Sequence, residues 1–230
     1  MRRNLKETIL RVVILLAGLV IAHLGVTIFL LVDLGTDPFN VLVQGIFRTL
    51  ERCFGWEFLT HGRVHIVISF LIILILLFLD RSYIKIGTLL CMVCGGPIID
   101  FFTGILKMFF ANGHPLWQNL ILLAVACAIL AFGMTIVIKS DAGTGPNDLV
   151  AVVVSDKLHK KFSVVRVIVD VAFVVSGFLL GGAVGIGTIV CACLVGPVAG
   201  VFLPINERWI TNVIQKHCKC QVNQDDSFIP

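Results

Sequence analysis

The chain carries the same short motif twice. Residues 22–40 align without a gap with residues 130–148. The identical positions are Gly25, Thr27, Ile28, Asp33, Gly35, Thr36 and Pro38 in the first copy, and Gly133, Thr135, Ile136, Asp141, Gly143, Thr144 and Pro146 in the second. A later pair of matches, Ile86-Gly87-Thr88 with Ile186-Gly187-Thr188 and Gly96-Pro97 with Gly196-Pro197, follows in the same order. The sequence therefore predicts two copies of one unit packed against each other, with function at their junction.

Long apolar runs indicate that each repeated unit spans a membrane. They cover roughly residues 8–32, 64–79, 86–110, 116–138, 164–181 and 184–205. Most reach the ~20 residues that a helix needs to cross ~30 Å of hydrocarbon. Hydrophobic residues make up 58% of the chain and charged residues 14%, which leaves too little polar surface for a soluble globule. These runs do not alternate as barrel strands do, so we expect an all-α bundle with six transmembrane helices and a first run that stays as a signal anchor.

We expect three parts in the chain. Residues 1–110 form the first membrane repeat and residues 111–206 the second, and residues 207–230 form a cytoplasmic tail. With the N-terminus in the cytoplasm, six spans leave only Arg48, Arg52, Arg63 and Lys107 outside, against fourteen Lys and Arg inside. That bias predicts both termini in the cytoplasm. The net charge of +4 then reflects the orientation of the chain in the membrane and its attraction to anionic lipid headgroups. It gives no basis for a nucleic-acid partner.

A break and a short helix follow the first and fourth spans. Gly35-Thr36-Asp37-Pro38 precedes a helix from Phe39 to Cys53, and Gly143-Thr144-Gly145-Pro146 precedes one from Asn147 to His159. Glycine allows a sharp turn, Thr or Asp can cap, and Pro suits a first helical position. The apolar part of each helix is only about seven residues long, which is short for a crossing and favours a re-entrant half-helix.

The symmetry of the two repeats depends on these short helices. If they re-enter, each repeat has three spans and the second copy is inverted. If they cross, each repeat has four spans and the copies are parallel. Moving the short segments across the membrane gives an equally good charge bias, so charge does not decide between the two arrangements. The shortness of these segments favours the inverted arrangement, and the parallel one stays open.

These motifs resemble a known group of proteins. The doubled Gly-Thr-Asp/Gly-Pro element with a short helix, and the Gly-Thr and Gly-Pro of a later span, are similar to the YczE/YyaS/YitT family of bacterial integral membrane proteins over most of residues 8–205. The short stretch after the last span is closer to the YczE-like branch than to members with a further C-terminal domain. The resemblance implies a bacterial cytoplasmic membrane location and implies no reaction.

The two breaks supply the candidate solute site. Helix N-termini carry free N–H groups and a partial positive charge, so two half-helices that meet near the midplane would form a site for a polar or anionic solute. The candidate residues are Gly35, Thr36, Asp37, Asn40, Gly143, Thr144, Asn147 and Asp148. The alternative is that each break is a tight turn at the membrane surface.

Three ionisable residues within spans are candidates for proton or ion coupling. Asp100, Asp170 and His23 lie at depths where a charge costs several kcal/mol without water or a partner, and His titrates near neutral pH. Structural roles are the alternative: Asp100 lies near an interfacial kink at Pro97, and Asp170 pairs with Arg166 one helical turn away.

Other residue patterns predict packing. Gly87, Gly95, Gly96, Gly104, Gly187, Gly196 and Gly200 are expected to bring helices close between the repeats. Cys91, Cys94, Cys127, Cys191 and Cys193 are read as small packing residues. The tail His217-Cys218-Lys219-Cys220 offers soft ligands but too few for a closed metal site, so we expect no metal and no cofactor.

No nucleophile elbow, phosphate loop, HExxH or paired catalytic carboxylates occur, so we expect no enzyme. The leading hypothesis is a small secondary transporter or exporter of an unidentified polar or anionic solute in the lipid bilayer, and a homodimer stays open. The alternative is a non-transporting membrane scaffold or accessory protein that acts through a partner.

Overall fold

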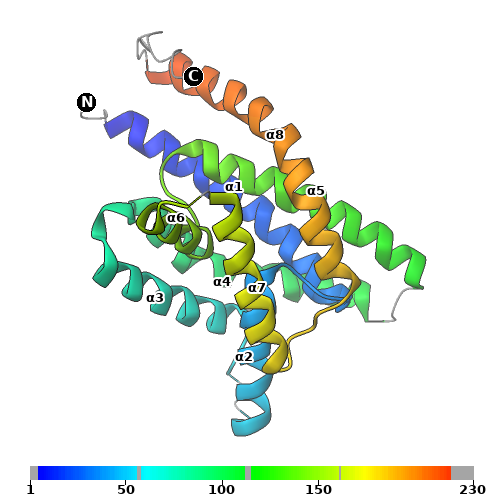
Figure 1. Ribbon diagram of the computed structural model, residues 1–230. Coiled ribbons are helices and arrows are strands. Elements are labelled where there is room, and N and C mark those ends of the chain that lie inside the picture. Colours follow the sequence, from blue (N-terminus) through cyan, green and yellow to red (C-terminus); the bar gives the residue numbers. More distant parts are fainter. Residues whose placement is uncertain (1–4, 56–57, 112–114, 161, 219–230) are drawn as a thin grey trace.

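The computed structural model is all-helical in the part of the chain that it describes, which is residues 5–55, 58–111, 115–160 and 162–218. Within these residues, eight α-helices and one short 3-10 helix follow one another (Figure 1). Their bounds are α1 Leu5–Val32, α2 Pro38–Phe54, α3 His61–Leu79, η1 Arg81–Tyr83, α4 Ile86–Phe110, α5 Leu116–Ser140, α6 Pro146–Leu158, α7 Phe162–Leu179 and α8 Ile186–Cys218.

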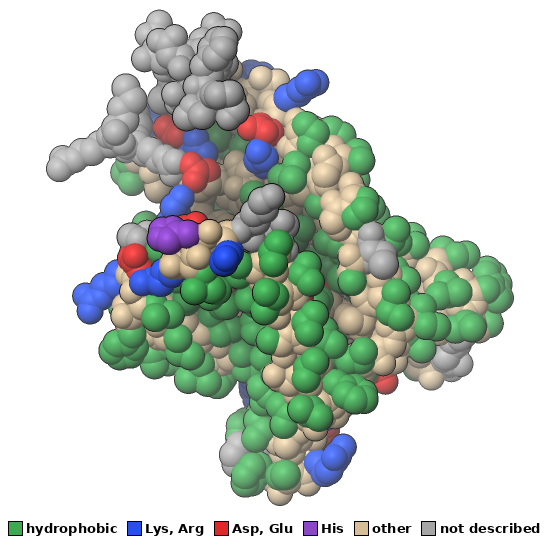
Figure 2. Space-filling view, viewed as in Figure 1, with side chains coloured by type: hydrophobic (Ala, Val, Ile, Leu, Met, Phe, Trp, Pro, Cys, Tyr) green, Lys and Arg blue, Asp and Glu red, His purple; other side chains and the backbone are tan. Residues whose placement is uncertain are grey.

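The helices α1, α3, α4, α5 and α8 are long and apolar enough to cross a membrane. α7 is shorter, with its apolar part over Val167–Leu179. Apolar side chains cover most of the face shown in Figure 2, and the charged side chains gather toward its ends. Residues such as Phe78, Met108 and Phe101 are largely exposed on the bundle, which only a lipid environment satisfies. The prediction of a polytopic helical membrane protein is confirmed.

Both predicted breaks and both short helices are present. α1 is followed by Asp33 and α5 by Asp141, each in the left-handed conformation, with φ of 51° and 53°. Gly35 comes next in the first break with φ of 103°, a conformation that glycine adopts without a Cβ penalty. α2 and α6 then begin at a proline whose fixed φ suits a first helical turn.

The centre of the bundle is the antiparallel pair of α1 and α5. Gly133 lies against the backbone of Ala22, where a Cβ would collide with the Ala22 nitrogen. One end of the contact joins Gly25 to Ala126 and the other joins Gly18 to Ile136, so the helices run in opposite directions. Small residues thus let the two backbones touch, as in other helix pairs in membranes.

The long helices α4 and α8 each run parallel to one helix of this pair. α4 runs parallel to α1, because Leu15 lies against Gly87 and His23 lies against Gly95. α8 runs parallel to α5, because the Cys127 Sγ lies 3.9 Å from the Val190 oxygen while Thr135 accepts a 2.7 Å bond from Asn206 further along. α1 and α4 therefore point one way, and α5 and α8 the other.

Basic residues meet at one end of this bundle. Arg11, Lys85 and Lys139 form ion pairs there with Glu7, Asp141 and Glu207. Ile14 of α1 packs with Ile210 and Ile214 of α8, and the two ends of the described chain lie side by side (Figure 1). We call this the terminal end. The opposite end lies roughly 30 Å away along α1, at 1.5 Å per residue.

The glycines fulfil only part of the packing prediction. Gly87, Gly95, Gly96 and Gly187 make the close contacts expected of small residues. Gly104, Gly196 and Gly200 do not, because a Cβ at any of them would meet no described atom within 4 Å. The prediction was wrong for these three, since sequence spacing does not say which face of a long helix its neighbours cover.

Candidate functional site

The first break places a hydrogen-bonded polar group inside the bundle. The Asp37 carboxylate accepts bonds from the Asn40 amide side chain (2.8 Å), the Asn40 backbone N–H (3.3 Å) and the Thr36 hydroxyl (3.3 Å). The Asn40 Oδ1 in turn lies 3.1 Å from the His61 Nε2. Thr36 and Asn40 are almost fully buried. Asp37 thus caps α2 and links the break to the start of α3.

A pair of histidines continues this group into the middle of the bundle. The rings of His23 on α1 and His65 on α3 stand edge to face, 5.7 Å between centroids, and Phe39 packs on His65 at 5.3 Å. The His23 Nδ1 donates to the Leu19 oxygen at 2.9 Å, so its Nε2 is left as an acceptor. Gly95 of α4 makes room for both rings, because a Cβ there would lie 2.9 Å from each.

His65 is 5% exposed, and its Nδ1 has no hydrogen-bond partner among the described residues. A buried polar atom in this state costs about 1–3 kcal/mol, so the His65 Nδ1 is a candidate position for a polar ligand or a buried water. We call His23, Asp37, Asn40, His61 and His65 the histidine cluster. His61 and His65 were not among the predicted site residues, although with Ser69 they recur at every fourth residue of α3 and so share one helix face.

Asp100 lies beside this cluster in a capping role. Its carboxylate accepts a 2.6 Å bond from the Thr60 hydroxyl and a 3.0 Å bond from the Gly62 N–H. Thr60 is itself the N-cap of α3 and accepts from the Arg63 N–H. Asp100 therefore fixes the start of α3 from the adjacent helix α4, and these two bonds explain why a carboxylate is tolerated there.

Asp170 of α7 lies near the first break. Its charge and that of Asp37 are close enough to repel each other, and Phe173, one turn further along α7, packs on Phe39. The side chain of Arg166 lies outside the described part of the structure, so the predicted pairing with Asp170 stays a prediction. Of the three candidate coupling residues, His23 belongs to the histidine cluster, and Asp100 and Asp170 lie beside it.

The second break lies against the start of α4. Gly143 contacts Gly87 and Thr88, and the Asn147 amide donates to Asp148 at 3.1 Å. Gly35 of the first break instead contacts Thr188 of α8. The two breaks thus contact different helices, and only the first belongs to the histidine cluster.

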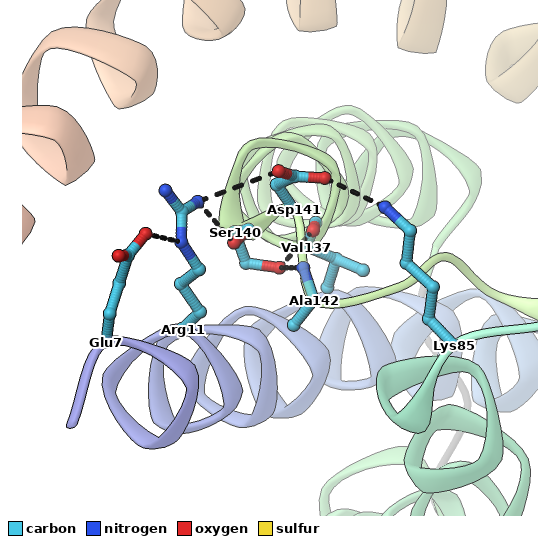
Figure 3. Close-up of polar contacts among 7 residues, drawn as sticks. All are labelled: Glu7, Arg11, Lys85, Val137, Ser140, Asp141 and Ala142. Carbon is cyan, nitrogen blue, oxygen red and sulfur yellow. Dashed lines mark hydrogen bonds and ion pairs between the residues drawn. The ribbon is translucent and has the colours of Figure 1, made fainter. Parts of the chain in front are cut away.

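An ion-pair network closes the terminal end beside the second break (Figure 3). Asp141 lies between Lys85 at 2.9 Å and Arg11 at 4.0 Å, and Arg11 also donates to the Ser140 oxygen at 3.1 Å and to Glu7 at 2.8 Å. These side chains join α1, α4 and α5. Arg11, Lys85 and Asp141 line a cleft of about 320 Å³ together with Thr8 and Ile86.

Among the described residues, no three His, Cys, Asp or Glu side chains are placed to hold a metal ion together. The tail motif that begins at His217 continues into Lys219 and Cys220, which lie outside the described residues, so the structure does not address that prediction. Cys91, Cys127 and Cys191 are buried in apolar clusters, in agreement with a packing role. The side chain of Cys193 also lies outside the described part of the structure.

Comparison with known proteins gives relatives without an assigned activity. A family model described as "Family of unknown function (DUF6198)" matches residues 9–204. The chain is 31% identical over 196 residues to an uncharacterized protein of Haemophilus influenzae, covering 85% of this chain and 84% of the relative. It is 28% identical to the uncharacterized membrane protein YczE of Bacillus subtilis (86% and 88% covered) and 26% identical to YyaS of the same organism (83% and 91%). No solved structure matches the chain.

Proposed function

Because the chain belongs to the family of unknown function DUF6198, as its likeness to YczE and YyaS predicted, we propose a function from its own geometry. The function is that of a small secondary transporter of a polar solute, coupled to protons. The observation that carries it is the histidine cluster, with a His65 Nδ1 that no described residue satisfies, inside a bundle whose outer surface is apolar. An ionisable residue inside a membrane bundle lowers the stability of the folded protein, so such residues point to a functional site.

The elements around the cluster support a transport role. α1, α2 and α3 each contribute side chains to it, and α4 leaves space for it at Gly95. α2 starts inside the bundle and is separated from α1 by an irregular segment. Irregular backbone at membrane depth is tolerated where it is covered by protein or lines a polar site.

We infer further that the two halves are inverted repeats. The N–H of Gly187 donates to the Leu34 oxygen at 2.7 Å, and the N–H of Gly87 donates to the Ala142 oxygen at 3.0 Å. Leu34 aligns with Ala142, and Gly87 aligns with Gly187. Each half therefore donates one such bond to the matching position of the other half. The opposed directions of the α1–α4 and α5–α8 pairs are those of an inverted arrangement, which many secondary transporters use for alternating access.

The charges of the cluster favour a polar uncharged or cationic solute over an anionic one. Asp37 already occupies the positive end of the α2 dipole, so little attraction remains there for an anion. Asp170 adds a second carboxylate nearby. His23 and His65 are the proposed proton carriers, because an imidazole ring can bind or release a proton at either ring nitrogen.

The protein is proposed to lie in the bacterial cytoplasmic membrane with both termini in the cytoplasm. The basic residues Arg11, Lys85 and Lys139 gather at the terminal end, as the positive-inside rule expects of a cytoplasmic face. Reporter fusions at the two termini test this orientation directly.

Reconstituted transport tests the function. Purified protein in liposomes with trapped pyranine is given, in turn, a sugar alcohol, a neutral amino acid, a diamine and a dicarboxylate under an imposed pH gradient. We expect one class other than the dicarboxylate to change the luminal pH. His65→Gln and Asp170→Asn should abolish that change, while the control Gly196→Ala, a site with open space, keeps it. If no class moves protons, or if both variants match the wild type, the proposal fails and the scaffold hypothesis gains support.

A further inference from the structure

One face of α2 covers the two histidines that α3 contributes to the histidine cluster. Phe39, Val43 and Phe47 recur at every fourth residue and so lie along this face. The centre of the Phe39 ring stands 5.3 Å from that of His65. The centre of the Phe47 ring stands 6.4 Å from that of His61. Val43 is fully buried in an apolar cluster that α2 shares with α3, so α2 shields both imidazole rings on this side.

The neighbouring face of α2 is polar and is bonded to the segment that follows α1. Asn40, Gln44 and Arg48 lie along it, because they too recur at every fourth residue. One carboxylate oxygen of Asp33 accepts a 2.6 Å bond from Arg48 and a 3.3 Å bond from Gln44. Asn40 and Gln44 are buried, whereas the side chains of Arg48 and Asp33 are 34% and 56% exposed. Asp33 therefore holds α2 where its polar face reaches the surface of the protein.

Other contacts bind α2 tightly to α7. Gly45 packs directly on Gly177, because a Cβ on Gly45 would lie 2.3 Å from the Gly177 oxygen. The Thr49 hydroxyl donates a 2.7 Å bond to the Leu180 oxygen just after α7. Backbones in direct contact leave no space for one helix to slide past the other. A movement of α2 away from α3 would therefore carry α7 with it.

Arg48 links this pair of helices to the end of α1. One guanidinium nitrogen donates to Asp33, and another donates at 3.2 Å to the Gly181 oxygen beyond α7. The planar guanidinium makes both bonds at once and so fixes their direction. An ion pair between partly exposed side chains contributes little to stability, because water screens the charges. The contact is thus specific in geometry and easily opened.

We propose that α2 and α7 form a lid over His61 and His65, and that the Asp33–Arg48 contact is the latch that keeps the lid closed. The irregular segment 33–37 joins α2 to α1 and offers the hinge, since the ends of elements absorb such changes of backbone angle. The latch lies at the end of α1 opposite the terminal end, so opening would admit solute from that side. This use of the lid rests on the proposed transport function, whereas the movement itself is measured without any solute.

The test is the rate at which diethyl pyrocarbonate modifies each histidine of the purified full chain in detergent. Trypsin cuts at Arg63, so His61 and His65 fall in separate peptides that hold one histidine each, and mass spectrometry reads them independently. His159 is exposed and serves as the internal standard. In the wild type we expect His61 and His65 to react far more slowly than His159.

Two variants open the latch from either side. Asp33→Asn removes the charge and keeps the backbone, because asparagine accepts the left-handed conformation of this position as aspartate does. Arg48→Gln removes the other partner. Each should raise the rates at His61 and His65 by up to about fivefold, the change in open population that an ion pair of this exposure allows. About 1 M NaCl should raise them in the wild type and add little in Asp33→Asn.

Each variant has a matched control. Asp141→Asn changes the aspartate that aligns with Asp33, which also has a left-handed backbone and an ion pair but lies at the terminal end. Arg52→Gln removes the same charge one turn after Arg48 on the same helix. Both controls should keep the wild-type histidine rates. Unchanged rates in both latch variants, or equal increases in the controls, would overturn the proposal.

The salt series on the wild type decides the case where a latch variant does not fold. Rates at His61 and His65 that stay constant with salt, relative to His159, overturn the latch. Failure of the solute assay while Asp33→Asn still exposes the histidines rejects the transport proposal alone. Solute transport by a protein whose histidines stay protected in both latch variants rejects the latch alone, so the two failures are distinguishable.

Discussion

The role of Asp100 gives the sharpest test of the site. Its carboxylate accepts two bonds, at 2.6 Å from the Thr60 hydroxyl and at 3.0 Å from the Gly62 N–H. Asp100→Ala removes the side chain that accepts from the Gly62 N–H, at a glycine buried against Gly96. Hydrogen bonds to charged groups contribute about 1.5–3 kcal/mol each, and Thr60 can turn its hydroxyl elsewhere. We therefore expect Asp100→Ala to lower the free energy of unfolding by about 3 kcal/mol.

Asp100→Asn separates this role from proton coupling. The amide oxygen still accepts from the Gly62 N–H, and the Thr60 oxygen can accept from the amide nitrogen. The loss should then be about 1 kcal/mol, with transport retained. Equilibrium unfolding in mixed micelles measures both variants, and a double-mutant cycle with Thr60→Val isolates the Thr60–Asp100 coupling. Asp100→Ala with wild-type stability, or Asp100→Asn that unfolds as the wild type but cannot move protons, would refute the capping role.

Single contacts give three further predictions. Tyr83 donates a 2.8 Å hydrogen bond to Asp156, and this bond raises the pKa of the phenol above its usual value near 10. The stability that the bond adds is therefore present below about pH 10 and is lost as the pH rises through the raised pKa. Tyr83 is the single tyrosine, so absorbance at about 295 nm should report this titration and show it shifting down in Asp156→Asn. Gly133→Ala should destabilise the protein by about 1–3 kcal/mol through overpacking against Ala22. Gly196→Ala should stabilise it by up to about 1 kcal/mol through helix propensity. Reversed signs in thermal melts would contradict the packing of α1 on α5. Asp141→Asn should cost less than about 1 kcal/mol, and less again in about 1 M salt, because its partner Lys85 is exposed; a larger, salt-independent loss would contradict this.

The local elements were predictable because they depend on residues close together in the chain. Apolar runs of about 20 residues specify spanning helices wherever they occur. The short helices could be placed to within about one residue at each end, because Pro38 and Pro146 favour a helix start at their own positions. The motif comparison also placed the chain in its family, since the Gly-Thr-x-Pro pattern is a local signature.

The candidate site was predicted only in part. Asp37, Asn40, His23, Asp100 and Asp170 do gather in one region. Their roles could not be predicted, because the roles depend on which group faces each carboxylate. Asp100 looked like a buried charge on α4, yet its partners come from the start of α3.

The sequence by itself determined that this protein spans a membrane as helices with two interrupted segments, because hydrophobic length and the absence of a proline N–H act locally. Only the tertiary structure decided that the first break joins His61 and His65 while the second meets the start of α4. It also decided which glycines are covered by a neighbouring helix. The physical reason is that an apolar helix in lipid can pack through any face, so its neighbours are chosen by close contacts such as Gly133 on Ala22, between residues far apart in the chain.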